Sequence, residues 1–371
     1  MQTIKKEIKR NILLNPGPAT TTARVKSALI EADICPRESE FGDVLARVKE
    51  KCLRVVDGNK SHQAILIGGS GTAAIEACLS RATYDKKILI LENGAYGERM
   101  AKICSALKIP HHTIKFAWGD PISQEIVQKH LLEHAHEYST MAFIHHETTV
   151  GILNDLPNLY QLASRHKLST LVDAMSSYAG IEINLQHTPV DYLVSSSNKC
   201  IQGFAGLGIC LVKNETLTAI RKHPQRSFYL DLIINFDAQE KTHQFAFTPP
   251  VQILYALDEA LNEFFEQGGI KARAKRYADL YTVMVKGLEE LGFKSLVAPK
   301  DHAKLLTAFR MPEISGFSFK GYHDYLYAKG ITIYPGKNAK ENSFRVANIG
   351  DLTLKDIELF LKETSNYLKT L

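Results

Sequence analysis

The chain has 371 residues, of which 45% are hydrophobic and 23% charged, the composition of an ordinary soluble globular protein. Its formal net charge of +5 is mild for this length and no block of basic residues stands out, so nothing favours nucleic acid as a partner. No stretch resembles a membrane span or a secretory signal and the six cysteines lack CxxC spacing, so we expect a cytoplasmic protein with reduced thiols.

Strands and helices are predicted to alternate through the first 212 residues. After a rigid Asn-Pro-Gly-Pro bend at residues 15–18, helices are expected at 23–29 and 44–56. A strand at 64–67, a Gly/Ser/Thr turn at 68–72 and a helix at 73–80 form the next unit. Further strands are expected at 88–91, 112–114 (edge type), 141–144, 170–172, 192–194 and 207–212, with helices ending near 107, 134 and 166. This alternation predicts a mostly parallel α/β sheet with helices on both faces.

The pattern changes after the two prolines at 249 and 250. Helices are expected at 251–267 and 271–291, followed by short strands near 305–309, 331–333 and 344–346, a helix around 323–329 and a closing helix at 351–371. We therefore predict an N-terminal segment (1–20), a large domain (21–250), and a linking helix with a smaller C-terminal α/β domain (251–371).

Polar features gather where the predicted strands end, which is where ligands bind in such sheets. The clearest is Lys199, which follows a buried strand in a Ser/Asn-rich pocket. Burial lowers the pKa of a lysine, and a neutral amine is a nucleophile. The alternative interpretation is a surface lysine in a loop.

Together these features suggest pyridoxal phosphate as the cofactor, with Lys199 forming a Schiff base to its aldehyde. Asp173 ends a strand and is placed to keep the pyridine nitrogen protonated. The turn Ser70-Gly71-Thr72 would hold the phosphate at a helix N-terminus, although a tight packing turn is the alternative. Tyr96 is the candidate to cover the ring, and Thr148 the candidate to contact the ring oxygen.

Seven motifs then carry a resemblance to a known family. They are Asn-Pro-Gly-Pro (15–18), Gly-Ser-Gly-Thr (69–72), Glu-Asn-Gly-Ala-Tyr-Gly (92–97), His-Glu-Thr-Thr-x-Gly (146–151), Val-Asp-Ala-Met-Ser-Ser (172–177), Ser-Ser-Ser-Asn-Lys-Cys-Ile-Gln-Gly (195–203) and Phe-Arg-x-x-Asn-Ile-Gly (344–350). The chain resembles the 2-aminoethylphosphonate–pyruvate transaminases among the class V aminotransferases, which have the fold type I architecture. The resemblance covers about residues 11–350.

The resemblance implies a role for each matching residue. Lys199 would carry the cofactor and shuttle a proton, and Asp173 would pair with the pyridinium. Arg345 would bind the carboxylate of the amino acceptor, and plausibly the phosphonate. The remaining cofactor contacts would come from Ser70, Gly71, Thr72, Tyr96, Thr148 and Asn198, and from Thr248 of a neighbouring subunit in a homodimer.

The expected reaction transfers the amino group of 2-aminoethylphosphonate to pyruvate, giving phosphonoacetaldehyde and L-alanine. Alanine–glyoxylate or serine–pyruvate transamination is an alternative, although those relatives more often have Gln at the position of Asn198. Cysteine desulfuration would need a late catalytic cysteine, and no cysteine follows Cys210. A degenerate cofactor-binding protein is disfavoured because Lys199, Asp173 and Arg345 are all present.

Two further features leave alternatives open. Arg37 lies beyond the first helix, and we hypothesise that it enters the site to recognise the phosphonate, an exposed salt-bridging arginine being the alternative. His130 and His134 are four residues apart, a spacing that zinc can use, but the segment is very polar and no third ligand is in reach. We expect a solvated helix there and no metal.

Overall fold

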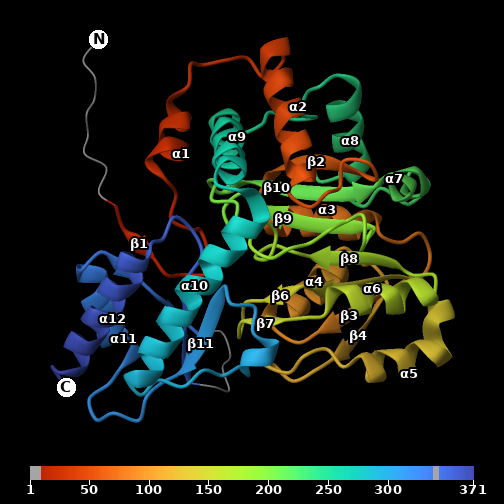
Figure 1. The fold of residues 1–371 in the computed structure, drawn as a ribbon. Coiled ribbons are helices and arrows are strands. Elements are labelled where there is room, and N and C mark those ends of the chain that lie inside the picture. The colour runs from red at the N-terminus through yellow and green to blue at the C-terminus, as the bar shows by residue number, and fades with distance from the viewer. Residues whose placement is uncertain (1–9, 337–341) are drawn as a thin grey trace.

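A computed structural model describes residues 10–336 and 342–371, and a seven-stranded sheet forms its centre (Figure 1). Its order is β2 (His62–Gly69), β10 (Gly206–Lys213), β9 (Tyr192–Ser196), β8 (Ser169–Asp173), β5 (Tyr138–Ile144), β3 (Lys87–Glu92) and β4 (His111–Lys115). Only β10 runs antiparallel to its neighbours in this sheet. The predicted mostly parallel sheet is confirmed, and the strand expected to be an edge strand, β4, is one.

Helices cover both faces of this sheet (Figure 1). Up to residue 241 the helical elements are α1 (Ala23–Ser27), the 3-10 turns η1 (Ala28–Ile30) and η2 (Ala135–Glu137), α2 (Ser39–Arg54), α3 (Gly71–Arg81), α4 (Ala95–Ala106), α5 (Gln124–His134), α6 (Leu156–Arg165), α7 (Asn214–Ile220) and α8 (Leu232–Lys241). Thr22 caps α1 by accepting a hydrogen bond from the Val25 N–H, at the start of the helix predicted from residue 23. Helix α2 begins five residues earlier than predicted because Phe41, in its first turn, is fully buried.

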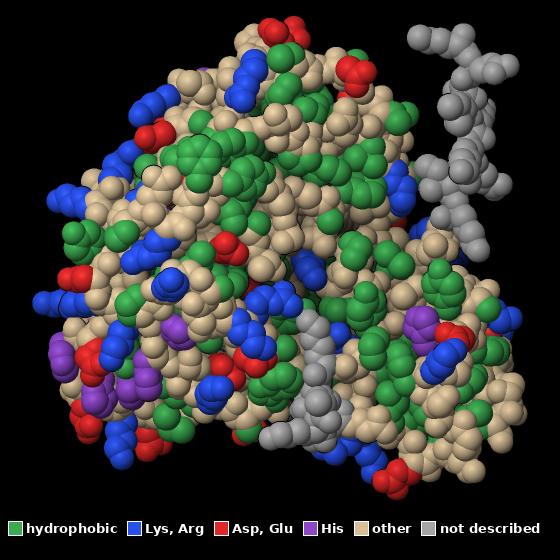
Figure 2. Space-filling view, turned by 180° about the vertical axis from the view of Figure 1, so that it is seen from behind, with side chains coloured by type: hydrophobic (Ala, Val, Ile, Leu, Met, Phe, Trp, Pro, Cys, Tyr) green, Lys and Arg blue, Asp and Glu red, His purple; other side chains and the backbone are tan. Residues whose placement is uncertain are grey.

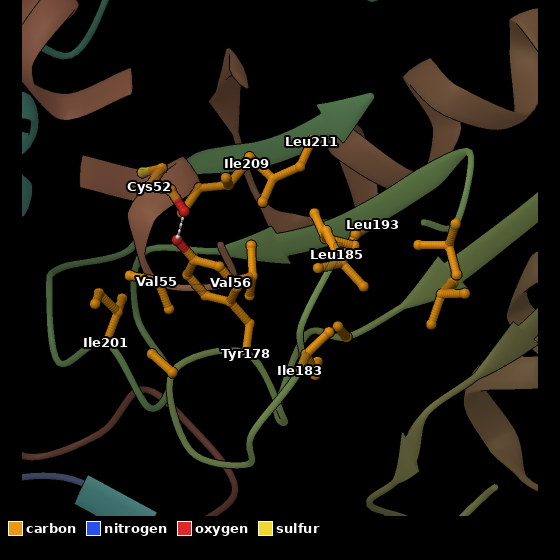
Figure 3. Packing of buried hydrophobic residues seen from close by; sticks show 14 of the residues in the cluster. Cys52, Val55, Val56, Tyr178, Ile183, Leu185, Leu193, Ile201, Ile209 and Leu211 are labelled. Atoms are coloured by element: carbon orange, nitrogen blue, oxygen red, sulfur yellow. Dashed lines mark hydrogen bonds between the residues drawn. The ribbon is translucent and has the colours of Figure 1, made fainter. Parts of the chain in front are cut away.

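The strands are buried on both faces, which explains their short, continuous apolar runs. In β2, Ile65 and Ile67 pack into the core on one face, whereas Ala64 and Leu66 pack into the core on the other. Figure 3 shows part of the core that contains Ala64 and Leu66. Here the Tyr178 hydroxyl donates a hydrogen bond of 2.7 Å to the Cys52 carbonyl. A tyrosine can be fully buried here because its polar atom has a partner.

The C-terminal part begins with a helix that packs against α2 beside the large sheet, and the elements after it lie at the lower left in Figure 1 and share a separate hydrophobic core. It comprises α9 (Val251–Glu266), α10 (Gly269–Glu290), η3 (Pro299–Asp301), β11 (Leu306–Arg310), α11 (Phe319–Ala328), β12 (Ile331–Thr332), β13 (Tyr334–Pro335), β14 (Ser343–Ala347) and α12 (Leu354–Leu368). Three of its strands form a sheet in the order β11-β14-β13. The division of the chain near residue 250 stays a prediction.

Residues 12–14 pair with and pack against the C-terminal part. Strand β1 (Ile12–Leu13) pairs in parallel with β12, and Leu14 is fully buried in the same core as Ile331. The strand expected at 331–333 therefore pairs with the start of the chain. Residues 1–9 of the predicted N-terminal segment lie outside the described residues.

Candidate active site

All strands of the large sheet except β10 run in one direction, so their carboxyl ends lie along one edge. Gly69 ends β2, Asp173 ends β8 and Ser196 ends β9, three residues before Lys199. A short hairpin that the sequence did not predict, β6 (His146–Glu147) with β7 (Ile152–Leu153), follows β5. The structure thus places the predicted strand-end residues around one edge.

Lys199 lies half-buried beneath the Asn-Pro-Gly-Pro bend. Its Nζ donates a hydrogen bond of 2.6 Å to the Pro16 carbonyl. Gly17, with φ of +132°, passes so close that a Cβ there would collide with the lysine amine. The Ala19 N–H donates to the Asn198 carbonyl at 3.0 Å, which ties the bend to the lysine turn. Lys199 is therefore not the solvated surface lysine of the alternative interpretation.

Asp173 is a buried carboxylate, 6% exposed, at the end of β8. Its Oδ1 accepts a hydrogen bond of 2.8 Å from the Met175 N–H. Burial, with a smaller contribution from the negative charge of Glu147, raises the pKa of Asp173 to about 7. The Met175 N–H and the positive charges of Lys199 and Arg99 lower the pKa but do not offset burial. A cationic partner at this carboxylate would restore its charged form.

The Ser70–Thr72 turn joins β2 to α3 and presents the N-terminus of that helix. Ser70 is the N-cap residue and its side chain makes no capping hydrogen bond. A Cβ at Gly71 would collide with the Met175 side chain, so this glycine lets the methionine lie against the turn. Backbone N–H groups and the helix dipole favour an anion at such a terminus.

Tyr96 lies in the first turn of α4, and its ring lines a pocket shared with Thr72, Asp173 and Met175. The Arg99 guanidinium lies over the ring, 4.8 Å from its centroid. Arg99 also donates a hydrogen bond of 3.3 Å to the Thr72 hydroxyl. The candidate stacking residue and the candidate phosphate turn are therefore joined by one arginine.

Arg345, in β14, is only 1% exposed and reaches the same region from the C-terminal part. Its Nη1 donates a hydrogen bond of 3.1 Å to the Thr148 carbonyl, and its Nε donates to the Pro335 carbonyl at 3.1 Å. Burial lowers the pKa of Arg345. Thr148 is itself 5% exposed. A buried guanidinium held by two carbonyls is suited to bind an anion.

The other predicted residues lie at the margin of this group. Asn198 Oδ1 accepts a hydrogen bond of 2.9 Å from the Ser196 hydroxyl. Thr248 is exposed. Arg37 is also exposed and donates to the Phe245 carbonyl at 2.7 Å and to Gln244 Oε1 at 3.0 Å. These contacts do not place Arg37 in the site of its own chain, and its proposed role stays a prediction.

Three residues at the site were not singled out from the sequence: Pro16, Arg99 and Met175. Pro16 and Met175 stand inside the motifs quoted above, and so does Glu147, which also follows a predicted strand but was given no role of its own. Arg99 follows Tyr96 by three residues, close to one helical turn, a spacing that places both side chains on one face of α4. His146 is also buried nearby, and among the described residues neither of its ring nitrogens has a hydrogen-bond partner.

Histidine side chains gather at one edge of the molecule, where β4 and α5 lie (Figure 2). The rings of His112 and His130 stack with centroids 5.0 Å apart, and His130 lies 4.8 Å from His134. No group of three or more metal-ligating side chains with suitable geometry occurs in the described ranges. Among these residues, no helix is long and apolar enough to cross a membrane.

The chain belongs to the class-V aminotransferase family, whose model matches residues 26–354. It is 36% identical to the 2-aminoethylphosphonate–pyruvate transaminase of Pseudomonas putida strain GB-1 over 340 residues, 91% of this chain and 92% of the relative. It is 35% identical to the Bacteroides fragilis strain YCH46 enzyme of the same name over 353 residues, 94% and 96% of the two chains. The protein is therefore an aminotransferase, as the sequence motifs predict.

Solved structures show the same fold at lower identity. Alanine–glyoxylate aminotransferase from Nostoc sp. has a TM-score of 0.91 at 22% identity, covering 99% of this chain and 98% of that one. Pyridoxamine–pyruvate aminotransferase from Mesorhizobium loti has a TM-score of 0.88 at 21% identity, covering 98% and 94%. The fold type I prediction is confirmed.

Class-V aminotransferases use pyridoxal phosphate, and the residues of the site fit this cofactor. Asp173 is a buried acceptor whose raised pKa a pyridinium would reverse. The N-terminus of α3 suits a phosphate, the Tyr96 ring offers an aromatic face, and Lys199 supplies an amine. The prediction of pyridoxal phosphate from the sequence is confirmed.

Proposed function

We propose that the chain transfers the amino group of 2-aminoethylphosphonate to pyruvate, giving phosphonoacetaldehyde and L-alanine. The observation that carries this proposal is the similarity, over nine-tenths of both chains, to enzymes named for this reaction. The buried Arg345 guanidinium supports it, because both the donor and the acceptor carry an anionic group that a guanidinium can bind.

Pyridoxal phosphate supplies an aldehyde that accepts the amino group and a ring that stabilises a carbanion. The chain supplies the rest of the chemistry. Lys199 Nζ holds and moves the proton at the reacting carbon, and Asp173 keeps the ring nitrogen protonated. Thr148 and Asn198 would contact the cofactor, the turn Ser70–Thr72 would hold its phosphate, and Tyr96 would cover its ring. Arg345 orients each substrate by its anionic group.

We further propose a homodimer in which Thr248 reaches the phosphate of the neighbouring subunit. Thr248 is exposed in the single chain, next to Phe247. Phe228, 72% exposed, and Tyr229, 45% exposed, pack against Phe247 with tilted rings whose centroids lie 5.6 and 4.9 Å from that of Phe247. An exposed aromatic cluster beside the residue expected to cross a subunit boundary supports this assembly. The free, mostly buried cysteines support a cytoplasmic location.

The test is the absorption spectrum of the purified enzyme with its cofactor. Adding 2-aminoethylphosphonate alone should convert the yellow bound cofactor to its colourless amino form, and pyruvate should restore the colour. Taurine, with the same chain length and a sulfonate, is the matched control for recognition of the phosphonate. If 2-aminoethylphosphonate left the spectrum unchanged while alanine or serine bleached it, the proposed donor would be wrong and the alanine–glyoxylate type would replace it.

A further inference from the structure

We propose that Glu147, in the hairpin after β5, is a positioning residue that sets the spacing between Tyr96 and Arg345. Neither the family match nor the names of the relatives assign it a role. The inference deepens the proposed function, because these two residues would hold the cofactor ring and the substrate anion. It rests on that function only for the choice of substrates in its test.

The first observation is the contact between Glu147 and the start of α4. Glu147 is fully buried, and its Oε2 accepts a hydrogen bond of 3.1 Å from the Tyr96 N–H. The Thr149 hydroxyl accepts from the Ala95 N–H at 2.9 Å. The N-cap residue of α4 is Gly94, which has no side chain to cap these donors. Side chains of the hairpin therefore cap the helix that carries Tyr96.

The second observation is the close approach of the two backbones. A Cβ at Gly94 would collide with the Glu147 side chain and would lie 2.8 Å from its Oε2. Gly94 is extended, with φ of 178°, so its lack of a side chain serves close approach rather than an unusual backbone conformation. The carboxylate thus lies directly against the turn that begins α4.

The third observation is a set of hydrogen bonds between Glu147 and Thr149, the two residues that flank Thr148. Glu147 Oε1 accepts hydrogen bonds from the Thr149 N–H at 2.9 Å and from the Thr149 hydroxyl at 2.6 Å. The intervening Thr148 carbonyl accepts the 3.1 Å hydrogen bond from Arg345 Nη1. One short stretch therefore fixes Tyr96 on one side and Arg345 on the other.

The charge of Glu147 is part of this arrangement. Burial raises the pKa of Glu147, whereas the hydrogen bonds from Thr149, Tyr96 and Gly97 lower it. A carboxylate that accepts several N–H groups at a helix N-terminus is stabilised by that helix. A neutral amide of the same size would bring an N–H group against these donors and displace them.

Glu147→Gln is the decisive variant, measured on the full-length enzyme with and without cofactor. A positioning role predicts that the dissociation constant of pyridoxal phosphate and the KM for pyruvate each rise about tenfold. The visible circular dichroism of the bound cofactor should change, because it reports the ring's orientation against Tyr96. Thr149→Val should shift the same quantities less, and Thr149→Ser, which keeps the hydroxyl, should restore them.

Thr353→Ala is the matched control, because it removes the capping threonine of α12, which is remote from the site. It should lower the melting temperature while leaving the dissociation constant, the circular dichroism and the KM unchanged. If Glu147→Gln behaved like this control, Glu147 would be only a structural cap and the proposal would be overturned. If Glu147→Gln did not fold, the Thr149 variants would test the proposal. A Thr149→Val enzyme with unchanged cofactor binding, circular dichroism and KM would then overturn it. If wild-type enzyme ignored 2-aminoethylphosphonate, the proposed function would fail, and cofactor binding would still test Glu147.

Discussion

Asp173 illustrates how one buried side chain can oppose folding and favour cofactor binding. Without a cationic partner, burial favours the protonated carboxyl and raises its pKa to about 7. A protonated pyridine nitrogen would supply the missing positive charge, so the cost of burying the carboxylate would be offset when the cofactor binds. The sequence placed Asp173 correctly because it ends a buried strand, but the sequence could not show its pKa, which depends on neighbours distant along the chain.

We expect the cofactor-free Asp173→Asn protein to be more stable than cofactor-free wild type at pH 8. The folded pKa of Asp173 lies above its usual value of 3.8, so its stabilising contribution is complete below pH 4 and is lost as the pH rises through 7. The difference should therefore be greatest above pH 7, with an upper bound of about 4 kcal/mol at about 1.4 kcal/mol per pKa unit. Urea unfolding at several pH values measures it, and an advantage that grew toward pH 4 would contradict the assignment.

Among the elements, the N-terminal bend has the most direct contact with the candidate catalytic lysine. Pro16 accepts the hydrogen bond from Lys199, and Gly17 leaves room for the amine. The sequence predicts a rigid bend from Asn-Pro-Gly-Pro, because the conformations of proline and glycine are local properties. It does not predict what the bend covers, since that contact joins residues 183 positions apart.

Gly17→Ala should impair the enzyme more than a comparable change elsewhere. The added methyl group would displace the Lys199 amine, so we expect a fall in kcat of about tenfold or more and weaker cofactor retention. Gly119→Ala is the control, because Gly119 also has a positive φ, +102°, but faces open space. Steady-state kinetics and cofactor content after gel filtration compare the two. Equal losses would mean that backbone strain, not the lysine contact, causes the defect.

At the scale of the whole molecule, the large sheet could be predicted from the sequence. The short strand pairs outside this sheet could not. Strands β2, β5, β8 and β9 appear in the sequence as apolar runs because both of their faces are buried. The pairs β1–β12 and β6–β7 have only two residues in each strand, too few for a periodic pattern. Helices α7 and α8 were missed, and α8 is stabilised by its Asp231 cap rather than by a marked apolar face. Most candidate site residues could be found in the sequence because they follow predicted strands. The contacts of Glu147 could not be predicted, because they depend on the β6–β7 hairpin.

The proposed homodimer makes a prediction about the aromatic cluster of Phe228, Tyr229 and Phe247. Phe228→Arg should convert the dimer to a monomer and lower activity, because Thr248 could no longer reach a neighbouring phosphate. Tyr327→Arg is the control, since Tyr327 is similarly exposed, at 64%, but lies on α11. Analytical ultracentrifugation gives the mass of each variant. A Phe228→Arg protein that stayed dimeric would place the subunit contact elsewhere.

The pairing of β1 with β12 also has a consequence for the order of events during protein synthesis. Residues 12 and 13 are made long before their partners at 331 and 332. Until these partners have been made, the bend that covers Lys199 has no strand to anchor it. The large sheet, which ends at residue 213, can form earlier. The newly made enzyme should therefore acquire its finished site only after residues 331 and 332 have left the ribosome.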